Sequence, residues 1–184
     1  MALREKLYTA EEFFEIASLP ENDDKRLELD DGEIVEMAES SAPNSVTAMR
    51  IGTFINVFVM SHNSGYVTGA DGGFKLGERR VRQPDVGFIS KERLPKLPKR
   101  IGIAPDLAVE IVSPDEDIFK KAREYLHAGT RMVWAVYTGE KTVHVMKLDE
   151  DGGLRSQPFG IGAVLDGGDV LPGFTLAVKD IFPD

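Results

Sequence analysis

The sequence predicts an α/β fold in which a mixed β-sheet is flanked by helices. Helical and strand patterns alternate along the 184 residues, which is typical of layered α/β architectures. The length fits one domain, and a hydrophobic share of 42% is enough to fill one sizeable core. No internal repeat and no low-complexity segment interrupts the pattern. We therefore expect residues 1–184 to form a single domain.

The N-terminal part predicts a short helix followed by a β-hairpin. Thr9-Ala10-Glu11-Glu12 has the form of a capping box, in which the first and last side chains bond each other's backbone N–H groups. Apolar residues between positions 27 and 37 flank Asp31-Gly32, a dipeptide favoured in tight hairpin turns. The expected hairpin carries two acidic side chains, Glu28 and Glu33.

A second helix and three strands are expected next. Apolar residues recur at helical spacing from Asn44 or Ser45 to Asn63-Ser64-Gly65, which predicts a helix packed on the core. These apolar residues are Val46, Met49, Phe54, Ile55 and Phe58. Strand patterns then cover residues 66–70, 80–89 and 106–113. A basic, proline-punctuated loop at residues 94–100 separates the last two strands and is expected to be exposed.

The C-terminal half predicts a third helix and further strands. Residues 115–128 have a helical pattern that Ser113 or Asp115 would cap and Gly129 would close. Strand patterns resume at residues 132–137 and 142–148. The tail from Asp149 is rich in turn-forming residues, and we expect it to add short strands that cover a sheet edge.

The composition excludes several kinds of site. The absence of cysteine excludes disulfides, thiolate nucleophiles and zinc sites with cysteine ligands. The three histidines, His62, His127 and His144, lie far apart and lack the spacing of metal ligands. The formal net charge of −9 argues against a general nucleic-acid binder. Basic residues do cluster at positions 79–82 and 91–100, so a local basic rim stays open.

No stretch of the sequence predicts a membrane segment. Residues 1–7 lack the apolar core of a signal peptide, and no later stretch approaches the roughly 20 apolar residues that span a bilayer. Together with the absence of cysteine, this predicts a cytoplasmic chain without a membrane partner.

Two carboxylates on successive strands are the strongest indication of chemistry. Glu110 lies within Leu107–Val112, an otherwise apolar strand, so either a metal ion or a buried ion pair must compensate its charge. Asp85 follows Pro84 directly before another apolar strand, where an ordinary turn is the competing interpretation. Hard oxygen ligands of this kind suit Mg²⁺ or Mn²⁺.

The helix after the Glu110 strand places Asp117, Lys121 and Tyr125 on one face, because they are spaced four residues apart. One interpretation is a surface Asp–Lys pair worth a few tenths of a kcal/mol. The other is a functional lysine, since this helix can return across the sheet and aim one lysine at the two carboxylates. Lys120 and Lys121 diverge by about 100° around the helix, so at most one of them can do so.

An ordered set of motifs extends along most of the chain. It comprises Arg26-x-Glu28-Leu29-x-Asp31-Gly32-Glu33, Pro84-Asp85-Val86, Glu110-Ile111-Val112-Ser113-Pro114, Asp117-x-x-x-Lys121-x-x-x-Tyr125-x-x-x-Gly129 and Val133-Trp134-x-Val136. From about Tyr8 to Leu171-Pro172-Gly173-Phe174, the set resembles the Uma2 family of restriction-endonuclease-like proteins. The resemblance implies a restriction-endonuclease-like mixed β-sheet flanked by helices, with additional C-terminal strands. It also implies an Mg²⁺-dependent endonuclease that hydrolyses phosphodiester bonds in nucleic acid, and DNA is the substrate that it favours over RNA.

The resemblance further implies a metal site and a catalytic lysine. In the PD-(D/E)xK pattern of that superfamily, Asp85 and Glu110 correspond to catalytic carboxylates that hold Mg²⁺ or Mn²⁺. The backbone carbonyl of Ile111 corresponds to a further metal ligand. Val112 occupies the position where the pattern has its lysine, so the resemblance passes the catalytic role to Lys121 in the next helix.

Three further residues receive lesser roles from the same resemblance. Glu28 resembles an additional upstream acid that binds the metal through water. Tyr125 and Asp117 are expected to support the site from the helix that carries the lysine. A homodimer is a further expectation, which the residues alone leave open.

A non-catalytic member of the fold is the alternative hypothesis. Such a protein would bind a protein or nucleic-acid partner and would keep Glu110 and Lys121 as a buried ion pair. The net charge of −9 favours this alternative. So do Gln83 and Tyr137, which stand where relatives often have arginine and aspartate.

Overall fold

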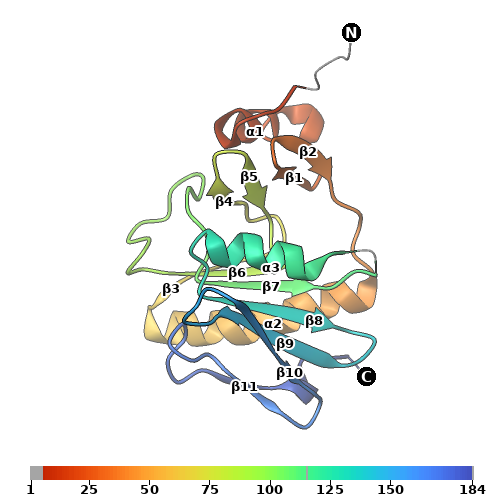
Figure 1. Ribbon diagram of the computed structural model, residues 1–184, viewed down its shortest axis with the longest axis vertical. Coiled ribbons are helices and arrows are strands. Elements are labelled where there is room, and N and C mark those ends of the chain that lie inside the picture. Colours follow the sequence, from red (N-terminus) through yellow and green to blue (C-terminus); the bar gives the residue numbers. More distant parts are fainter. Residues whose placement is uncertain (1–5, 115, 184) are drawn as a thin grey trace.

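A six-stranded sheet is the centre of the structure, a computed structural model that describes residues 6–114 and 116–183 (Figure 1). Its strands are β3 (Gly65–Thr68), β6 (Val86–Ser90), β7 (Leu107–Ile111), β8 (Met132–Tyr137), β9 (Thr142–Leu148) and β10 (Leu154–Phe159). They lie in the order β10-β9-β8-β7-β6-β3. Only β7 and β8 pair in parallel, because helix α3 (Ile118–His127) connects them. The mixed α/β architecture is therefore confirmed.

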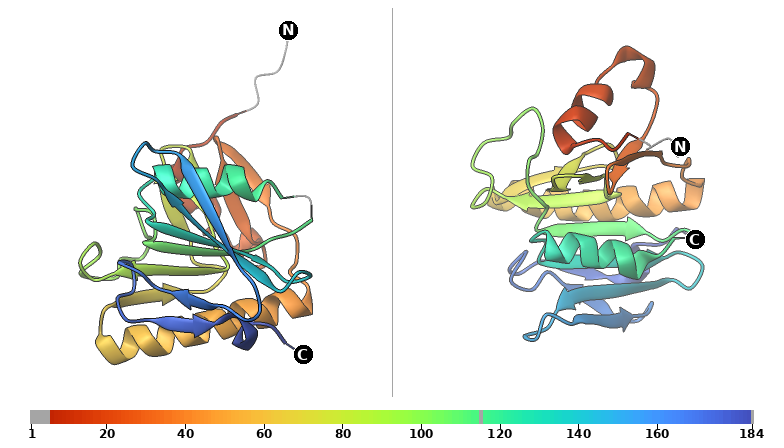
Figure 2. Two further views of the ribbon diagram at one scale, coloured as in Figure 1. Left: turned by 60° about the horizontal axis from the view of Figure 1, so that its bottom comes forward. Right: turned by 45° about the horizontal axis from the view of Figure 1, so that its top comes forward.

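The two long helices cover opposite faces of this sheet, as Figures 1 and 2 show. Alternate residues of β7 point to opposite faces, as they must in a strand. Leu107, Val109 and Ile111 belong to the core that the sheet shares with α2 (Ala42–His62). Ala108 belongs instead to the core beneath α3. By the same alternation, Glu110 lies on the α3 side of the sheet.

A smaller sheet packs above the α3 side and carries the N-terminal helix (Figure 1). It has four strands in the order β2-β1-β5-β4. These are β1 (Leu27–Asp30), β2 (Glu33–Glu36), β4 (Phe74–Gly77) and β5 (Arg80–Arg82), covered by helix α1 (Ala10–Ile16). Ala10 and Phe13 of the helix share a core with Leu27, Leu29 and Val81 of the strands.

The chain passes from the small sheet to the large one at Gln83-Pro84-Asp85. The prediction of one strand over residues 80–89 is therefore wrong, because β5 and β6 belong to different sheets. Pro84 has no N–H for a strand ladder, which explains why strand pairing stops there. No strand was predicted at β4, where two glycines precede Phe74.

The predicted N-terminal elements are confirmed in detail. The side chain of Thr9 accepts a hydrogen bond from the N–H of Glu12, and the Glu12 carboxylate accepts one from the N–H of Thr9. Strands β1 and β2 form the expected hairpin, with Leu29 opposite Ile34. At its turn, Asp31 and Gly32 have positive φ values of 53° and 94°, as the tight turn requires.

Helix α2 begins earlier than predicted and buries different residues. Ser41 caps it by accepting a hydrogen bond from the N–H of Asn44, and Asn63 ends it in the left-handed conformation. Of the apolar residues expected in the core, only Ile55 is fully buried. The buried line is Thr47, Ile51, Ile55 and Val59, which recur every four residues. The expectation that Val46, Met49 and Phe54 enter the core is wrong, because they lie on other faces of the helix.

The third helix starts later than predicted, at Ile118 and not at residue 115, whereas the tail follows the prediction. The predicted cap Ser113 is wrong, because Asp117 caps α3, and Asp115, the other cap considered, lies outside the described residues. Strand β10 extends the sheet beyond β9, as expected of the tail. The remaining elements are β11 (Val164–Asp166), β12 (Thr175–Ala177) and single 3₁₀ turns at Pro20–Asn22 and Val178–Asp180. Within the described residues, no helix is long and apolar enough to cross a membrane.

Candidate active site

Strands β6 and β7 bring Asp85 and Glu110 to facing positions. The last register pair between the antiparallel strands is Val86 with Val109, so Asp85, directly before β6, and Glu110 of β7 come next on the two chain segments. The N–H of Ile111 donates a hydrogen bond of 2.7 Å to Oδ2 of Asp85. Arg26 approaches Oδ1 of the same carboxylate, with its Nη2 at 3.3 Å. Asp85 is therefore oriented by the backbone of β7 on one side and by a cation on the other.

Glu110 is buried beneath α3, where two helix side chains hold its carboxylate. The Lys121 ammonium lies 3.0 Å from Oε2, and the Tyr125 hydroxyl donates a hydrogen bond of 2.7 Å to Oε1. Burial raises the pKa of Glu110 to about 7, against the attraction of Lys121. The nearby charges of Asp85 and Glu28 raise this pKa as well. The carboxylates gathered here thus carry more negative charge than one lysine can neutralise.

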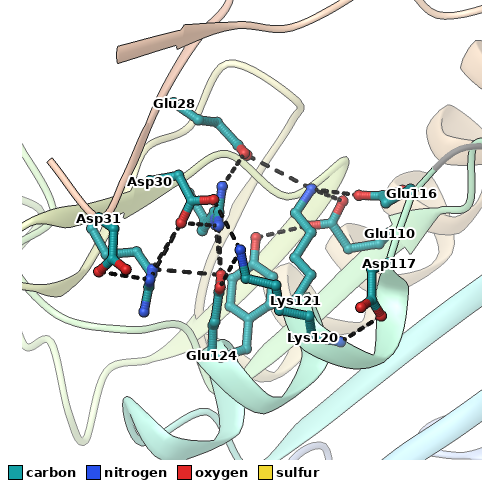
Figure 3. A network of polar contacts seen from close by, with 12 residues as sticks. Glu28, Asp30, Asp31, Glu110, Glu116, Asp117, Lys120, Lys121 and Glu124 are labelled. Atoms are coloured by element: carbon teal, nitrogen blue, oxygen red, sulfur yellow. Dashed lines mark hydrogen bonds and ion pairs between the residues drawn. The ribbon is translucent and has the colours of Figure 1, made fainter. Parts of the chain in front are cut away.

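Lys121 lies at the centre of three carboxylates (Figure 3). Its ammonium contacts Glu110 at 3.0 Å, Glu116 at 3.0 Å and Glu28 at 3.8 Å. Attraction by these acids raises the lysine pKa although burial lowers it, so Lys121 is charged at neutral pH. The side chain of Lys121 is 8% exposed, whereas that of Lys120 is 58% exposed and points to the surface. Of the two adjacent lysines, the helix therefore aims Lys121 at the carboxylates.

The small sheet adds a second layer of charge to the site. Glu28 on β1 accepts hydrogen bonds from the Arg82 guanidinium at 3.0 Å and from the N–H of Gln83 at 2.8 Å. Arg82 on β5 also contacts Asp30 at 2.8 Å and Glu124 of α3 at 2.6 Å. These acids raise the pKa of Arg82 despite its burial. Arg82 therefore bridges the small sheet and α3, and Glu28 is turned toward it.

Two sequence expectations need correction at this site. Asp117 does not share the functional face with Lys121 and Tyr125, because its side chain accepts a hydrogen bond from the N–H of Lys120 and caps the helix (Figure 3). The expected basic rim at positions 79–82 does not include Arg82, which is buried among carboxylates.

Three residues of the site were missed by the sequence interpretation. Glu116 is the nearest unpredicted neighbour, since it contacts Lys121 as closely as Glu110 does. Arg26 and Arg82 were missed as partners of Asp85 and Glu28. The sequence offered a signal for both arginines. Arg26 stands two residues before Glu28, and Arg82 stands two residues before Pro84. Glu116 had none, because it lies in a loop before the helix.

The donor atoms of the site fit a hard divalent ion. An extended residue directs its N–H and C=O to the same side, so the Ile111 carbonyl faces Asp85 as its N–H does. Two carboxylates and one carbonyl are the oxygen ligands that Mg²⁺ and Mn²⁺ prefer. The like charges that raise the pKa of Glu110 are also what a bound cation would offset. Within the described residues, however, no three acidic or histidine side chains converge into a ready-made metal cluster.

Two surface hollows lie beside the residues of the site. One, of about 390 Å³, is lined by Asp85, Arg26 and the outer face of α2. The other, of about 740 Å³, is lined by Glu116 and by the segments that follow β7 and β8. Ser40 lines both hollows, so the segment between β2 and α2 lies beside each of them.

Comparison with known proteins places this arrangement in a family. The family model Uma2, described as "Putative restriction endonuclease", matches residues 10–179. The chain belongs to the Uma2 family. Its Uma2 fold is similar to a crystal structure from Anabaena variabilis ATCC 29413, described as a putative nuclease belonging to DUF820. That similarity has a TM-score of 0.79 at 23% identity, and it covers 95% of this chain and 97% of the other. No curated protein matches the chain significantly.

The comparisons confirm the predicted family and the restriction-endonuclease-like fold class. At 23% identity, the solved structure supports the fold alone. The roles of Asp85, Glu110 and Lys121 in the Uma2 fold therefore stay predictions, as do the Ile111 carbonyl and Glu28 as metal ligands.

Proposed function

We propose that this Uma2 protein is a metal-dependent nuclease that hydrolyses phosphodiester bonds in nucleic acid, with DNA as the substrate. One observation carries the proposal. Asp85, directly before β6, and Glu110 on β7 both follow the register pair Val86–Val109, and the Lys121 ammonium lies 3.0 Å from Glu110. The family description as a restriction endonuclease supports the same class of reaction.

The oxygen atoms of Asp85, Glu110 and the Ile111 carbonyl would hold Mg²⁺ or Mn²⁺. When bound, such an ion supplies Lewis acidity and lowers the pKa of a coordinated water. The backbone N–H of Ile111 keeps Asp85 oriented, and the Tyr125 hydroxyl keeps Glu110 oriented. Both carboxylates are thus held without the ion, which lowers the entropy cost of assembling the site.

Lys121 would stabilise negative charge that develops on the scissile phosphate. Its ammonium is charged, and ion pairs with Glu110 and Glu116 hold it in place. Preorganised charge of this kind is effective because it needs no rearrangement during the reaction. Arg26 offers a second cation beside Asp85, at the wall of the hollow through which a phosphate would enter.

The proposal is tested by cleavage assays on purified full-length protein. Supercoiled, linear duplex and single-stranded DNA, together with RNA, are incubated with Mg²⁺ or Mn²⁺, and a chelator is added in parallel. We expect DNA cleavage that the chelator abolishes and that Asp85→Asn lowers at least about a hundredfold, because the variant loses a charged ligand. Asp151→Asn, an exposed aspartate in a distant turn, is the matched control. Intact substrates under all conditions would overturn the proposal.

A non-catalytic binding module is the second candidate, and one observation favours it. Both oxygens of Glu110 already have partners in Lys121 and Tyr125, as a purely structural buried ion pair would have. Titration calorimetry with Mn²⁺ separates the two candidates. A nuclease should bind the ion through a site that Asp85→Asn removes, whereas the binding module should show no such site.

A further inference from the structure

The outward face of α2 carries an apolar stripe that the fold leaves uncovered. Four of its side chains are Val46, Met49, Val57 and Met60, which are 43%, 71%, 63% and 71% exposed. Thr53, also exposed, lies between them. At 100° per residue, these positions lie opposite the buried line of Thr47, Ile51, Ile55 and Val59. The helix is therefore apolar on the side that faces away from its own sheet.

This face lacks the charge that marks a solvent-exposed helix. Charged residues make up 29% of the chain, yet α2 contains only Arg50 and the terminal His62 as ionisable side chains. Arg50 is engaged by donating a hydrogen bond of 2.6 Å to the carbonyl of Phe182. Figure 2 shows α2 along the outer edge of the molecule, with its outward side free of other elements. An exposed apolar surface of this kind is typical of a site that another protein surface covers.

The stripe is self-complementary about Thr53. Met49 and Val57 stand four residues before and after it, and Val46 and Met60 stand seven before and after it. Two copies of α2 that pack antiparallel would therefore bring Met49 against Val57 and Val46 against Met60, with Thr53 facing Thr53. Matching of a surface with itself is what a two-fold symmetric interface requires. We propose that the protein forms a homodimer through α2, with Thr53 on the two-fold axis.

Charge makes the outward face of α2 a more favourable contact between two copies than the acidic surfaces of the chain. Each chain carries a formal net charge of −9, so two copies repel each other wherever acidic surfaces meet. The outward face of α2 has no acidic side chain, since the helix contains none. The Thr53 hydroxyl donates to the carbonyl of Met49 at 2.8 Å, so burying it leaves no donor unpaired.

The length of the stripe is sufficient for a specific helix pair. Val46 to Met60 extends about 21 Å along the axis at 1.5 Å per residue. Phe54, which is 42% exposed, and Asn56 widen the contact on its two sides. A stable interface buries about 800 Å² per partner, so side chains beside α2 would also take part. The hollow beside Asp85 is lined by Met49, Thr53 and Val57, so the partner helix would form one of its walls.

The oligomeric state of the full-length protein tests this proposal without metal or nucleic acid. It therefore fails or stands independently of the nuclease proposal. Sedimentation velocity and light scattering should give the mass of a dimer for the unmodified chain. Thr53→Glu should yield monomers, with the dissociation constant raised at least about a hundredfold, because two carboxylates would face each other at the axis. Thr175→Glu, an exposed threonine on β12, should leave the dimer intact.

A charge-swap experiment tests the two-fold axis itself. Thr53→Lys should also be monomeric, whereas a mixture of the differently tagged Glu and Lys variants should form mixed dimers. Only an arrangement with residue 53 facing residue 53 predicts this rescue. Circular dichroism controls the fold, and glutamate and lysine both favour helix more than threonine does. A monomeric unmodified chain, a dimer that survives Thr53→Glu, or a failure of the mixed pair to associate would each overturn the proposal.

Discussion

At the scale of single residues, the unusual feature is one ammonium among three carboxylates. Lys121 is buried with Glu110, Glu28 and Glu116, and its neighbour Lys120 is not. Removing one member of a buried ion pair leaves an uncompensated charge, which is more costly than removing both members. The site therefore allows stability and catalysis to be separated by mutation.

Lys121→Ala should abolish cleavage and also lower the free energy of unfolding by about 3 kcal/mol, because Glu110 loses its counter-charge. Lys120→Ala should keep full cleavage activity and change stability by less than about 1 kcal/mol, since the Lys120 side chain is 58% exposed and water screens its ion pairs. Urea denaturation and cleavage assays measure the two effects. Equal losses in both variants would show that the lysine assignment is wrong.

The double variant Lys121→Met with Glu110→Gln separates the two roles of the pair. Neutral side chains of similar size remove both charges together, so stability should recover most of the loss seen in Lys121→Ala. Cleavage should stay absent, because the double variant lacks a metal ligand and the ammonium. Recovery of stability without activity would agree with the nuclease proposal. Recovery of cleavage in the double variant would contradict the roles of both residues.

At the scale of elements, α3 and the β1–β2 hairpin position the site. The cap at Asp117 fixes where α3 starts, and the packing of its apolar face on the sheet turns Lys121 toward Glu110. The hairpin turn fixes β1, which carries Glu28 toward Arg82. Changes at these two ends should therefore lower the stability of α3 and of the hairpin and leave the chemistry of the site unchanged.

Asp117→Ala should lower the free energy of unfolding by about 1 kcal/mol, because the N–H of Lys120 loses its acceptor. Asp117→Asn should behave like the original, since asparagine caps helices equally well. Both variants should keep metal binding and cleavage, because the Asp117 side chain is turned away from the carboxylates. A loss of cleavage in Asp117→Asn alone would return this residue to the supporting role first expected of it.

Gly32→Ala should destabilise the fold by about 1 to 2 kcal/mol. Gly32 has a φ of 94°, and an added Cβ would lie 3.0 Å from the Cβ of Leu7 and 3.3 Å from the carbonyl of Tyr8. Gly139→Ala is the matched control, because Gly139 has nothing within 4 Å of such a Cβ. Thermal unfolding measures the difference. Equal melting temperatures would show that the hairpin tolerates the side chain.

At the scale of the whole molecule, the site exists only where the two sheets meet. Glu28 and Arg82 come from the small sheet, Glu110 from the large one, Asp85 from the crossing between them, and Lys121 from α3. An ion held by Asp85 and Glu110 would bind the native state and not the unfolded chain, because folding brings these residues together. Binding should therefore stabilise the whole fold against unfolding.

Added Mn²⁺ should raise the melting temperature, and a chelator should reverse the rise. At a metal concentration of about a hundred times the dissociation constant, binding stabilises the native state by about 2.7 kcal/mol. Asp85→Ala should remove this rise, whereas Asp151→Ala should not, because Asp151 lies in the distant β9–β10 turn. The same rise in the two variants would mean that Mn²⁺ stabilises the protein at some other site.

The sequence by itself determined several local elements and the positions of charged residues on them. The capping box at Thr9, the Asp31-Gly32 turn and the apolar strand around Glu110 are local patterns, and each one specifies its own structure. The spacing of Lys121 and Tyr125 similarly predicted that both side chains would reach one face, and both contact Glu110. Local geometry was sufficient for these features because each one depends on residues that are close in the sequence.

Only the tertiary structure decided which charges meet and which apolar face is buried. Arg82 was expected at a rim, but docking of the small sheet on α3 buries it against Glu28 and Glu124. Apolar residues occupy several sides of α2, so its sequence does not select a core face. The sheet selects the line through Ile51 and Ile55, because the side chains of β7 pack against it. Long-range packing makes these choices, and the spacing of residues along one element carries no information about them.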